Sequence, residues 1–319
     1  MKSYTITDNK ETRAGFGVGL MEAAKKNDNV VALVADLKGS LKMDAFAKAY
    51  PDRFFECGIA EANMIGVAAG LATAGKIPFT GTFANFSSAR VYDQIRQSVA
   101  YSGKNVKICA SHAGITVGED GASHQSLEDV GMMKMLPGMT VIVPCDYNQT
   151  ILATKAAAET YGPMYMRFGR PKQPVFTTLD MNFTIGKAQV LNEGSDVSIF
   201  ATGIMVWEAL EACKKLEEKG IKAEIINVHT IKPLDNIAII NSVSKTHCAV
   251  TAEEHQLNGG LFDSIAQLIV RECHVPMEPV AVMDRWGQSG KPADLMKAYH
   301  LDADTIADAA IRVIMRKDE

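Results

Sequence analysis

Residues 58 to 82 read GIAEANMIGVAAGLATAGKIPFTGT, and this stretch contains the unit that repeats along the chain. Small and aliphatic residues fill positions 65 to 75, which predicts an apolar helix. A β-branched and aromatic run follows at 76 to 82 and predicts a buried strand. A helix that leads directly into a buried strand is typical of a parallel sheet with helical crossovers.

The same alternation extends in both directions from this stretch. In the first part of the chain we expect strands at residues 29–35, 76–82, 106–111, 139–143 and 163–168, and helices at about 11–26, 61–75, 88–101, 126–135 and 147–160. In the second part we expect strands near 197–201, 223–228, 248–252 and 279–283, and helices at about 205–219, 260–272 and 302–316. This pattern predicts an α/β fold class with two doubly wound α/β domains.

A stretch with little periodicity separates the two predicted domains. Residues 169 to 184 (GRPKQPVFTTLDMNFT) contain two prolines, which is typical of a linker. The chain has 319 residues and is 47% hydrophobic, more than a single core usually covers. We therefore expect a first domain at residues 1–180 and a second at 181–319.

Composition and charge exclude several functional classes. A net charge of -4 without a basic block gives no footprint for nucleic acid or an anionic membrane surface. The polar start and the lack of a long apolar run argue against a signal peptide or a membrane span. The six cysteines lack the short spacings of a zinc site or disulfide framework, which fits a reducing compartment. We expect a soluble, cytoplasmic protein.

Glu61 is an isolated carboxylate at the start of the apolar helix. A lone ionised carboxylate against apolar surroundings is costly, so it must be solvated, paired or turned toward a ligand. That makes Glu61 a candidate acid. A glutamate in the first turn of a helix also complements the positive end of the helix dipole, and from this residue alone the dipole interpretation is favoured.

The segment SHAGITVGEDGASH at 111 to 124 joins a predicted strand to a predicted helix with three glycines, two histidines and two acids. A connection of this length is unusual unless it has a function. Its histidines and Asp120 could bind a metal, but neither histidine has a ligand partner at helical spacing. Contact with a polyol or phosphate is favoured over a metal, and an ordered loop with capping residues remains an alternative for each residue alone.

Further candidates follow other predicted strands, where open parallel sheets bind their ligands. Phe83 and Phe86 are three apart at a strand-to-helix junction, so both can face a slot that stacks a flat heterocycle, although core packing is the commoner use. Guanidinium forks and hydroxyls match phosphate oxygens, although each such residue alone is more often a surface residue. The phosphate-binding candidates are Arg13, Ser40, His112 and Arg170.

Taken together, these segments resemble the C-terminal half of transketolase, that is, its pyrimidine-binding domain followed by its C-terminal domain. The resemblance covers nearly the whole chain, and the shared order of its motifs makes it specific. The motifs are GIAEANM (58–64), TFANF (82–86), SHAGITVGEDGASHQ (111–125), FGRP (168–171), EEHQLNGG (253–260) and SGKPADL (289–295).

The resemblance implies a thiamine diphosphate site on the first domain. Glu61 matches the family's glutamate that hydrogen-bonds the pyrimidine N1′ and favours the imino tautomer of the 4′-amino group, which activates the thiazolium carbon. Phe86, with Phe83 beside it, matches the aromatic slot for the pyrimidine ring, and Ile59 is expected to line it. Ala89 stands where many members have a third aromatic residue, so the far wall of the slot departs from the family.

The same resemblance implies roles in binding sugar phosphates. Arg13, Ser40, His112 and Arg170 match positions that hold the phosphate. Asp120 matches the residue that binds the hydroxyl beside the carbonyl. His124 matches a histidine near the reacting oxygens, and its ordinary pKa of about 6.5 suits proton transfer.

The implied activity is transfer of a two-carbon ketol unit between phosphorylated ketoses and aldoses, a reaction of the pentose phosphate pathway. Two alternatives in the same superfamily are a deoxyxylulose-phosphate synthase and the beta subunit of a 2-oxoacid dehydrogenase. The Gly118 to Gly121 run with His112 and Arg170 favours a sugar phosphate over a lipoyl-bearing partner. A third alternative is a non-catalytic structural subunit, against which the joint presence of the site residues argues.

The diphosphate half of the cofactor site has no match in this chain. The family holds Mg²⁺ and diphosphate with a Gly-Asp-Gly turn and a later Asn-Asn pair. Asp120-Gly121 and Asn148 match in part, but Glu119 replaces the first glycine and Gln149 the second asparagine, so we reject this match. We expect a separate N-terminal transketolase subunit to carry that domain and most of the Mg²⁺ ligands, with two copies of each chain. The polar residues after Met1 are expected to be a native start.

Overall fold

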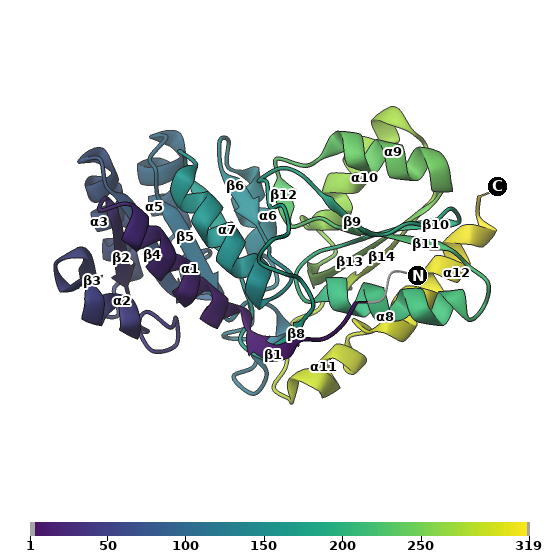
Figure 1. Ribbon diagram of the computed structural model, residues 1–319, viewed down its shortest axis with the longest axis horizontal. Helices are drawn as coiled ribbons and strands as arrows, with labels where there is room; N and C mark the ends of the chain where they lie inside the picture. Colours follow the sequence, from purple (N-terminus) through teal and green to yellow (C-terminus); the bar gives the residue numbers. More distant parts are fainter. Residues whose placement is uncertain (1–3, 318–319) are drawn as a thin grey trace.

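The computed structural model describes residues 4–317 and contains two α/β domains side by side (Figure 1). The outermost residues of the two expected domains, 1–3 and 318–319, lie outside the described residues, as does the start at Met1. Both domains have the α/β architecture that the alternating pattern predicts.

The first domain is built on a mainly parallel sheet. Within the described residues it has seven strands in the order β12-β6-β7-β5-β4-β2-β3. The strands are β2 (Val30–Val34), β3 (Phe54–Glu56), β4 (Ile77–Phe83), β5 (Lys107–Ser111), β6 (Thr140–Ile142), β7 (Met164–Arg167) and β12 (Thr230–Lys232). All neighbours pair in parallel except β12, which pairs antiparallel with β6.

Helices cover both faces of this sheet, and successive residues of β2 show the division. Val31 and Leu33 belong to one apolar cluster, and Val30, Ala32 and Val34 belong to another. This two-sided burial explains the continuous apolar run in the sequence. In the first domain, the helices that contribute to the cluster of Val31 are α3 (Glu61–Thr73), α5 (Tyr92–Gln94), the π-helix Ile95–Tyr101 and α6 (Asp129–Met135). The helices that contribute to the cluster of Val30 are α1 (Thr12–Lys26), α2 (Asp44–Ala49) and α7 (Tyr147–Glu159).

Helices α1 and α7 lie against each other along their length (Figure 1). A Cβ atom on Gly15 would lie 2.3 Å from the Tyr147 carbonyl oxygen, and one on Gly19 would lie 2.7 Å from the Thr154 Cβ. Glycine is therefore required at both positions for the two helices to approach this closely.

The second domain has a smaller sheet. The part that the structure describes contains five strands in the order β14-β13-β10-β11-β9, parallel except for β9. The strands are β9 (Gln189–Asn192), β10 (Val197–Ala201), β11 (Ala223–Asn227), β13 (Ala249–Gln256) and β14 (Met277–Val282). Its helices are α8 (Met205–Glu217), α9 (Asn236–Thr246), α10 (Leu261–Glu272), α11 (Pro292–Ala298) and α12 (Ala303–Met315).

Two features of the linker region differ from the sequence-based expectation. Within the expected linker, β8 (Lys172–Val175) pairs antiparallel with β1 (Asp8–Glu11). The stretch after β8 is fixed by Asp146, whose Oδ2 accepts the N–H groups of Phe176 at 2.9 Å and Thr177 at 2.7 Å. A buried carboxylate that accepts backbone donors holds this segment without regular secondary structure.

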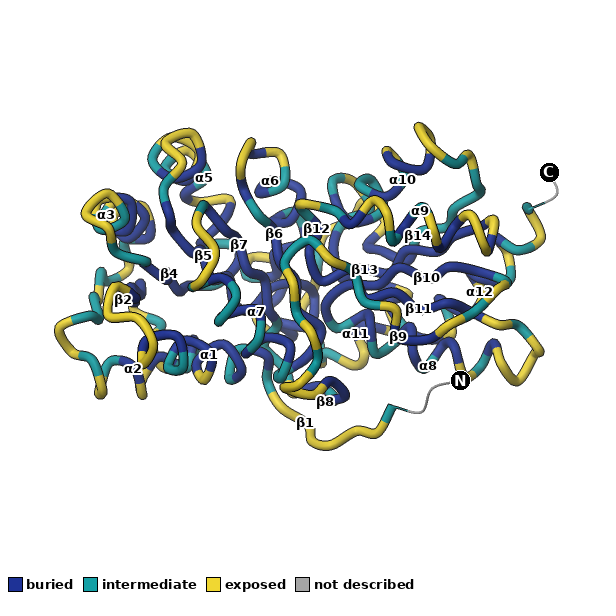
Figure 2. The backbone as a smooth tube through the Cα atoms, turned by 45° about the horizontal axis from the view of Figure 1, so that its top comes forward, coloured by how far each residue is buried: buried dark blue, intermediate teal, exposed yellow. Residues whose placement is uncertain are grey.

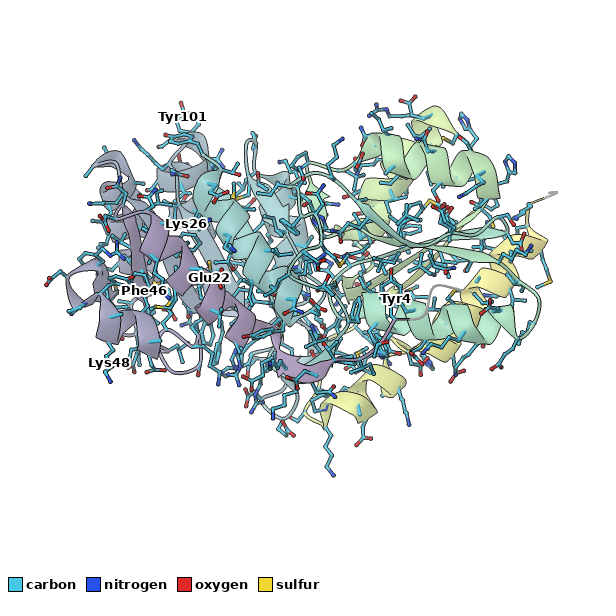
Figure 3. All side chains as sticks on the ribbon, in the orientation of Figure 1. Tyr4, Glu22, Lys26, Phe46, Lys48 and Tyr101 are labelled. Atoms are coloured by element: carbon cyan, nitrogen blue, oxygen red, sulfur yellow. The ribbon has the colours of Figure 1, made fainter. Side chains whose placement is uncertain are left out.

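The expected helix at 88–101 begins later than predicted. The hydroxyls of Ser87 and Ser88 both donate to the carbonyl oxygen of Ala84, at 3.3 and 2.6 Å, where the short helix α4 (Ala84–Ser87) ends. Such side-chain bonds compete with helix continuation. The chain turns before α5 begins, and the π-helix ends at Tyr101, whose side chain projects from the surface (Figure 3).

Surface exposure differs between the helices of the first domain. Helix α3 has an exposed side that carries Ala62, Gly66 and Gly70, and it lies at the end of the molecule away from the second domain (Figure 2).

No helix formed by residues 4–317 is long and apolar enough to cross a membrane. The six cysteines are free thiols.

Candidate functional site

The site residues are positioned at the carboxyl edge of the first sheet. Phe83 ends β4 and α4 follows it, His112 follows β5, and Gly169-Arg170 follows β7. Ser40 lies in the turn after β2, and Glu61 begins α3 after β3. Because these strands are parallel, their carboxyl ends meet at one edge, and residues distant in sequence come together there.

Glu61 is almost fully buried, with 5% of its surface exposed, at the first position of α3. Arg90 Nη1 donates to its Oε1 at 3.1 Å. The same guanidinium lies over the ring of Phe86, 4.1 Å from the ring centroid. Arg90 thus touches both the candidate acid and one face of the candidate aromatic slot.

The aromatic slot includes imidazole rings as well as phenyl rings. The ring of Phe83 stacks on His112 with centroids 3.9 Å apart and lies 5.9 Å from Phe86. His124 meets Phe86 edge-on at 5.4 Å. Ile59, expected to line the slot, is 78% exposed in this chain.

Three of the four phosphate candidates, Arg13, His112 and Arg170, form one electropositive group. Burial, followed by the charges of Arg13 and Arg170, lowers the pKa of His112 to about 3, so its imidazole is neutral at neutral pH. Arg13 donates to the Ser40 carbonyl oxygen at 3.2 Å. Arg170 donates to the Val117 carbonyl oxygen at 2.6 Å. Two guanidinium groups beside a neutral imidazole make a suitable setting for an anion.

Acidic groups balance these charges at the rim. Arg13 forms an ion pair with Glu11 at 2.8 Å. Asp120, at the exposed tip of the loop, lies 3.8 Å from Arg170, and Glu119 lies 3.5 Å from it. Arg170 is therefore held by the Val117 carbonyl oxygen and lies beside two exposed carboxylates.

His124 stands at the base of the same loop. Its Nδ1 is 3.0 Å from the Ser123 hydroxyl, and the Asn85 side-chain amide donates to the Ser123 carbonyl oxygen at 2.7 Å. These contacts join the loop to α4, which carries the aromatic slot. Candidate proton-transfer, aromatic and anion-binding residues thus share one region.

The residues of the rejected diphosphate match lie in two separate parts of the structure. Asn148 donates to the Thr177 carbonyl oxygen at 2.7 Å, and Gln149 accepts the Cys145 N–H at 2.9 Å. Asn148 therefore holds the linker and Gln149 holds the turn before α7, whereas Asp120 lies at the exposed loop tip. Among residues 4–317, no three histidine, cysteine, aspartate or glutamate side chains gather as a metal site.

Two residues near the site were not among the sequence-based candidates. The sequence does not indicate that Arg90 belongs to the site, because only folding brings it to Glu61 and Phe86. Glu254 lies in the second domain, in the quoted motif EEHQLNGG, and reaches the first domain through the N–H of Thr116 at 2.7 Å. The motif was an available signal, but a sequence does not reveal which of its two glutamates points across a domain boundary.

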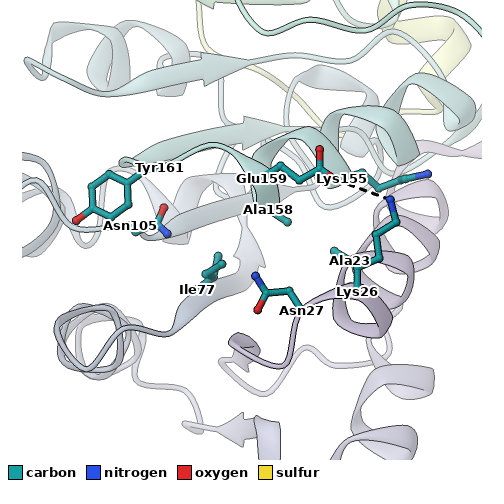
Figure 4. A pocket seen from close by; sticks show the side chains of 9 residues that line it. All are labelled: Ala23, Lys26, Asn27, Ile77, Asn105, Lys155, Ala158, Glu159 and Tyr161. Atoms are coloured by element: carbon teal, nitrogen blue, oxygen red, sulfur yellow. Dashed lines mark ion pairs between the residues drawn. The ribbon is translucent and has the colours of Figure 1, made fainter.

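A cavity of about 290 Å³ lies away from this site, at the amino ends of the strands (Figure 4). The ends of α1 and α7 and the start of β4 line it, and Lys26 pairs with Glu159 there at 3.8 Å. Next to it, the buried ammonium group of Lys107 donates to Asn105 Oδ1 and to the carbonyl oxygens of Thr160 and Gly162, at 2.7 to 2.8 Å. These bonds fix the turn that leads into β7.

The fold and the site together define a two-domain α/β protein with a buried carboxylate and a cluster of aromatic rings at the edge of its first sheet. Residues 8–174 match the family model of the transketolase pyrimidine-binding domain, and residues 186–306 match that of the transketolase C-terminal domain. The chain belongs to the transketolase family. This confirms the resemblance and fold class inferred from its motifs.

Similar proteins include separate subunits as well as whole-length enzymes. The chain is 46% identical to a protein of Methanocaldococcus jannaschii named as a transketolase C-terminal section, over 93% of this chain and 94% of that protein. It is also 46% identical to the 6-deoxy-6-sulfo-D-fructose transketolase subunit of a Clostridium strain, over 94% and 93% of the two chains. The solved structure of a split-gene transketolase, described as an inactive beta4 tetramer, superimposes with a TM-score of 0.90 at 43% identity, covering 97% of this chain and all of that one.

Proposed function

We propose that this chain is a subunit of a thiamine diphosphate-dependent transketolase that moves a two-carbon ketol unit between sugar phosphates. The observation that carries the proposal is the buried carboxylate of Glu61 close to the aromatic slot, with the electropositive group of His112, Arg13 and Arg170 at the same sheet edge. This combination offers one place for a heterocycle and another for an anion.

The chain's residues fit the pyrimidine half of thiamine diphosphate. Phe86 has a face that already accepts a planar cation, the guanidinium of Arg90, and Phe83 lies beside it. A flat pyrimidine is bound by the same kind of surface. When bound, the cofactor supplies the carbon that takes up the ketol unit. Glu61 would hold a proton at the ring nitrogen N1′, and Ile59 would line the slot once a partner covers it.

Sugar recognition is assigned to the loop and to the electropositive group. Arg13, Ser40, His112 and Arg170 would bind the phosphate, since guanidinium groups match its oxygens. Asp120 would accept a bond from the hydroxyl beside the carbonyl, and His124 would move a proton to or from the reacting oxygens. His124 is a catalytic candidate because its ring faces Phe86, at the junction of the cofactor and sugar regions.

We also propose a partner chain that carries the diphosphate-binding domain and most of the Mg²⁺ ligands, with two copies of each chain in the complex. The names of the similar proteins from Methanocaldococcus and Clostridium support a subunit that functions with another. The exposed side of α3 offers a contact surface, because a Cβ on Gly66 or Gly70 would meet nothing within 4 Å. Small residues there would let a partner helix approach closely.

The anionic group of the sugar substrate can be a phosphate or a sulfonate. The Clostridium relative is named for a sulfonated fructose, and a sulfonate is an anion of the same tetrahedral shape as a phosphate. The electropositive group suits both anions. Phosphorylated substrates remain the proposal, with the sulfonated sugar as the alternative to be tested beside them.

The proposal also covers the domain boundary, the cellular compartment and the non-catalytic alternative. We place the domain boundary between residues 180 and 181, which lies between β8 and β9 in the segment held by Asp146. Six free thiols support a reducing, cytoplasmic compartment. The non-catalytic alternative is disfavoured because the chain retains the buried acid, the slot and the anion group together.

The test is reconstitution with the partner subunit. The chain is produced alone and together with a candidate partner, and both samples are assayed for thiamine diphosphate binding by calorimetry and for ketol transfer by a coupled assay. We expect Mg²⁺-dependent binding and turnover only in the complex. Turnover by a sample that mass spectrometry shows to contain this chain alone would overturn the partner proposal, and a complex that binds cofactor but transfers no ketol unit from any phosphorylated or sulfonated ketose would overturn the activity.

A further inference from the structure

The second domain touches the candidate sugar-binding loop through a buried carboxylate. Glu254, on β13, has 5% of its surface exposed. Its Oε1 accepts the backbone N–H of Thr116 at 2.7 Å. Thr116 lies in the loop between His112 and Asp120, so a side chain of one domain fixes the backbone that carries the sugar-binding candidates of the other.

The loop is shaped to admit this carboxylate. Gly114 has a φ of 82°, in the left-handed region that glycine adopts without cost. A Cβ at this position would lie 2.2 Å from the carboxyl carbon of Glu254. The space beside Gly114 is therefore occupied by Glu254, and the two residues fit only as a pair.

A second contact ties the far end of the loop to the same domain. The Gln125 side-chain amide donates to the carbonyl oxygens of Ile115 and Gly118 within the loop, at 3.0 and 3.2 Å. It also donates to the carbonyl oxygen of Gln288 in the second domain, at 2.9 Å. The loop is thus closed on itself and attached to the second domain at Thr116 and at Gln125.

Glu254 lies beside a buried ion pair of the first domain. Arg167, on β7, donates to the Glu254 carbonyl oxygen at 2.8 Å and pairs with Asp129 at 2.9 Å. Burial raises the pKa of Glu254, and the nearby charge of Arg167 opposes that shift. Arg167 also donates to the Ser126 carbonyl oxygen at the end of the loop. Glu254, its bond from Thr116 and the ion pair of Arg167 with Asp129 form one connected network.

We propose that Glu254 is a positioning residue for ketol transfer and that the second domain serves to hold the sugar-binding loop in its working shape. Glu254 touches neither cofactor nor substrate. It acts through Thr116 on the loop that presents His112, Asp120 and His124. This inference rests on the proposed function for its kinetic consequence, but the anchoring of the loop can be measured independently.

The experiment compares three variants in the full chain. Glu254→Ala removes the acceptor, and Glu254→Gln keeps an acceptor oxygen while removing the charge. The matched control is Glu253→Ala. Glu253 is the adjacent glutamate and is equally buried, but it accepts the N–H groups of Leu261 and Phe262, at 2.6 and 2.9 Å, within the second domain. Its loss weakens the start of α10 without touching the loop.

Two measurements are made on each variant. Hydrogen–deuterium exchange of peptides covering residues 112–125 reports the loop in the chain alone. Steady-state kinetics of the reconstituted complex, with calorimetric binding of thiamine diphosphate, report function. Glu254→Ala is expected to raise exchange in the loop at least tenfold and the KM for a phosphorylated ketose about 10- to 100-fold, the size expected for loss of one buried hydrogen bond. Cofactor affinity is expected to stay within threefold.

The variants distinguish a positioning role of Glu254 from a general loss of stability. Glu254→Gln is expected to restore KM to within threefold of wild type, and Glu253→Ala to lower thermal stability with unchanged loop exchange and KM. Equal loop exchange in Glu254→Ala and wild type, or equal effects of Glu253→Ala and Glu254→Ala, would overturn the inference. If Glu254→Ala does not fold, Glu254→Asp replaces it, because aspartate draws the carboxylate back by one methylene. Glu254→Asp is expected to raise hydrogen–deuterium exchange in the loop, by less than is expected for Glu254→Ala. A wild-type complex without ketol transfer refutes the proposed function, and the exchange measurement still decides the anchoring.

Discussion

The guanidinium of Arg90 donates a 3.1 Å hydrogen bond to the carboxylate of Glu61 while lying over the ring of Phe86, 4.1 Å from its centroid. These are the carboxylate and the ring face proposed for the pyrimidine of thiamine diphosphate. In the chain alone, Arg90 therefore occupies the contacts that the cofactor would make. Cofactor binding must exchange one planar group for another at this position.

Replacing Glu61 with glutamine should abolish most activity without unfolding the chain. An amide can still accept the bond from Arg90, but it cannot take up and release a proton at neutral pH. Loss of one general acid–base group costs about 10²- to 10⁴-fold in rate. Steady-state turnover of the reconstituted complex at saturating cofactor measures this, with thermal unfolding as the check on folding. Turnover within threefold of wild type would contradict the assigned role.

Arg90→Ala should tighten cofactor binding. The half-exposed ion pair with Glu61 and the contact with Phe86 are each worth up to about 1 kcal/mol, so their removal should lower the cofactor Kd by about 3- to 10-fold. Calorimetry on the reconstituted complex measures the change, and Arg96→Ala, an exposed arginine on the π-helix, is the control. Weaker binding would instead indicate that Arg90 replaces the aromatic wall missing at Ala89.

His112→Ala and Arg170→Ala should discriminate between phosphorylated and unphosphorylated acceptors. Charge-assisted bonds to phosphate are worth roughly 1.5 to 3 kcal/mol, or about 10- to 150-fold each, and they are lost only for the phosphorylated sugar. The measurement is the ratio of kcat/KM for ribose phosphate to that for glycolaldehyde. The exposed Lys172→Ala serves as a nearby control. Equal losses for both acceptors would remove these residues from the phosphate site.

Lys107 should make stability depend on pH in the alkaline range. Burial lowers the pKa of Lys107 from 10.5 to about 7 in the folded chain. Between pH 7 and 10.5 the unfolded chain therefore binds the additional proton, so the free energy of unfolding rises with pH across this window. The difference between wild type and Lys107→Met should grow by up to about 1.4 kcal/mol per pH unit in reversible chemical denaturation. Lys48→Met, at an exposed position (Figure 3), should show a constant difference.

The sequence predicted those features that depend on local pattern. The apolar run at Val30 to Val34 required a strand buried on both faces, and the three-residue spacing of Phe83 and Phe86 was enough to propose a slot. His112 and Arg170 are far apart in the chain, but both were expected just after predicted strands, where a parallel sheet binds ligands. The charge of Arg170 acts on His112, so the two residues lie near each other.

Features that depend on tertiary contacts could not be predicted in this way. Nothing in the sequence around Arg90 indicates that it pairs with Glu61, because Arg90 lies in the turn before α5 and Glu61 is 29 residues away at the start of α3. The contact of Glu254 with Thr116 spans 138 residues and two domains. Strand β12 is too short to show a period, and its pairing with β6 across the domain boundary has no local signal.

That short strand has a further consequence for the architecture. Residues Thr230 to Lys232 belong to the second domain in sequence but occupy the border of the first sheet, beside β6. They cover backbone groups that would otherwise offer a template for pairing with another molecule. A fragment that ends at the linker would therefore leave β6 as an uncovered edge strand of the first sheet.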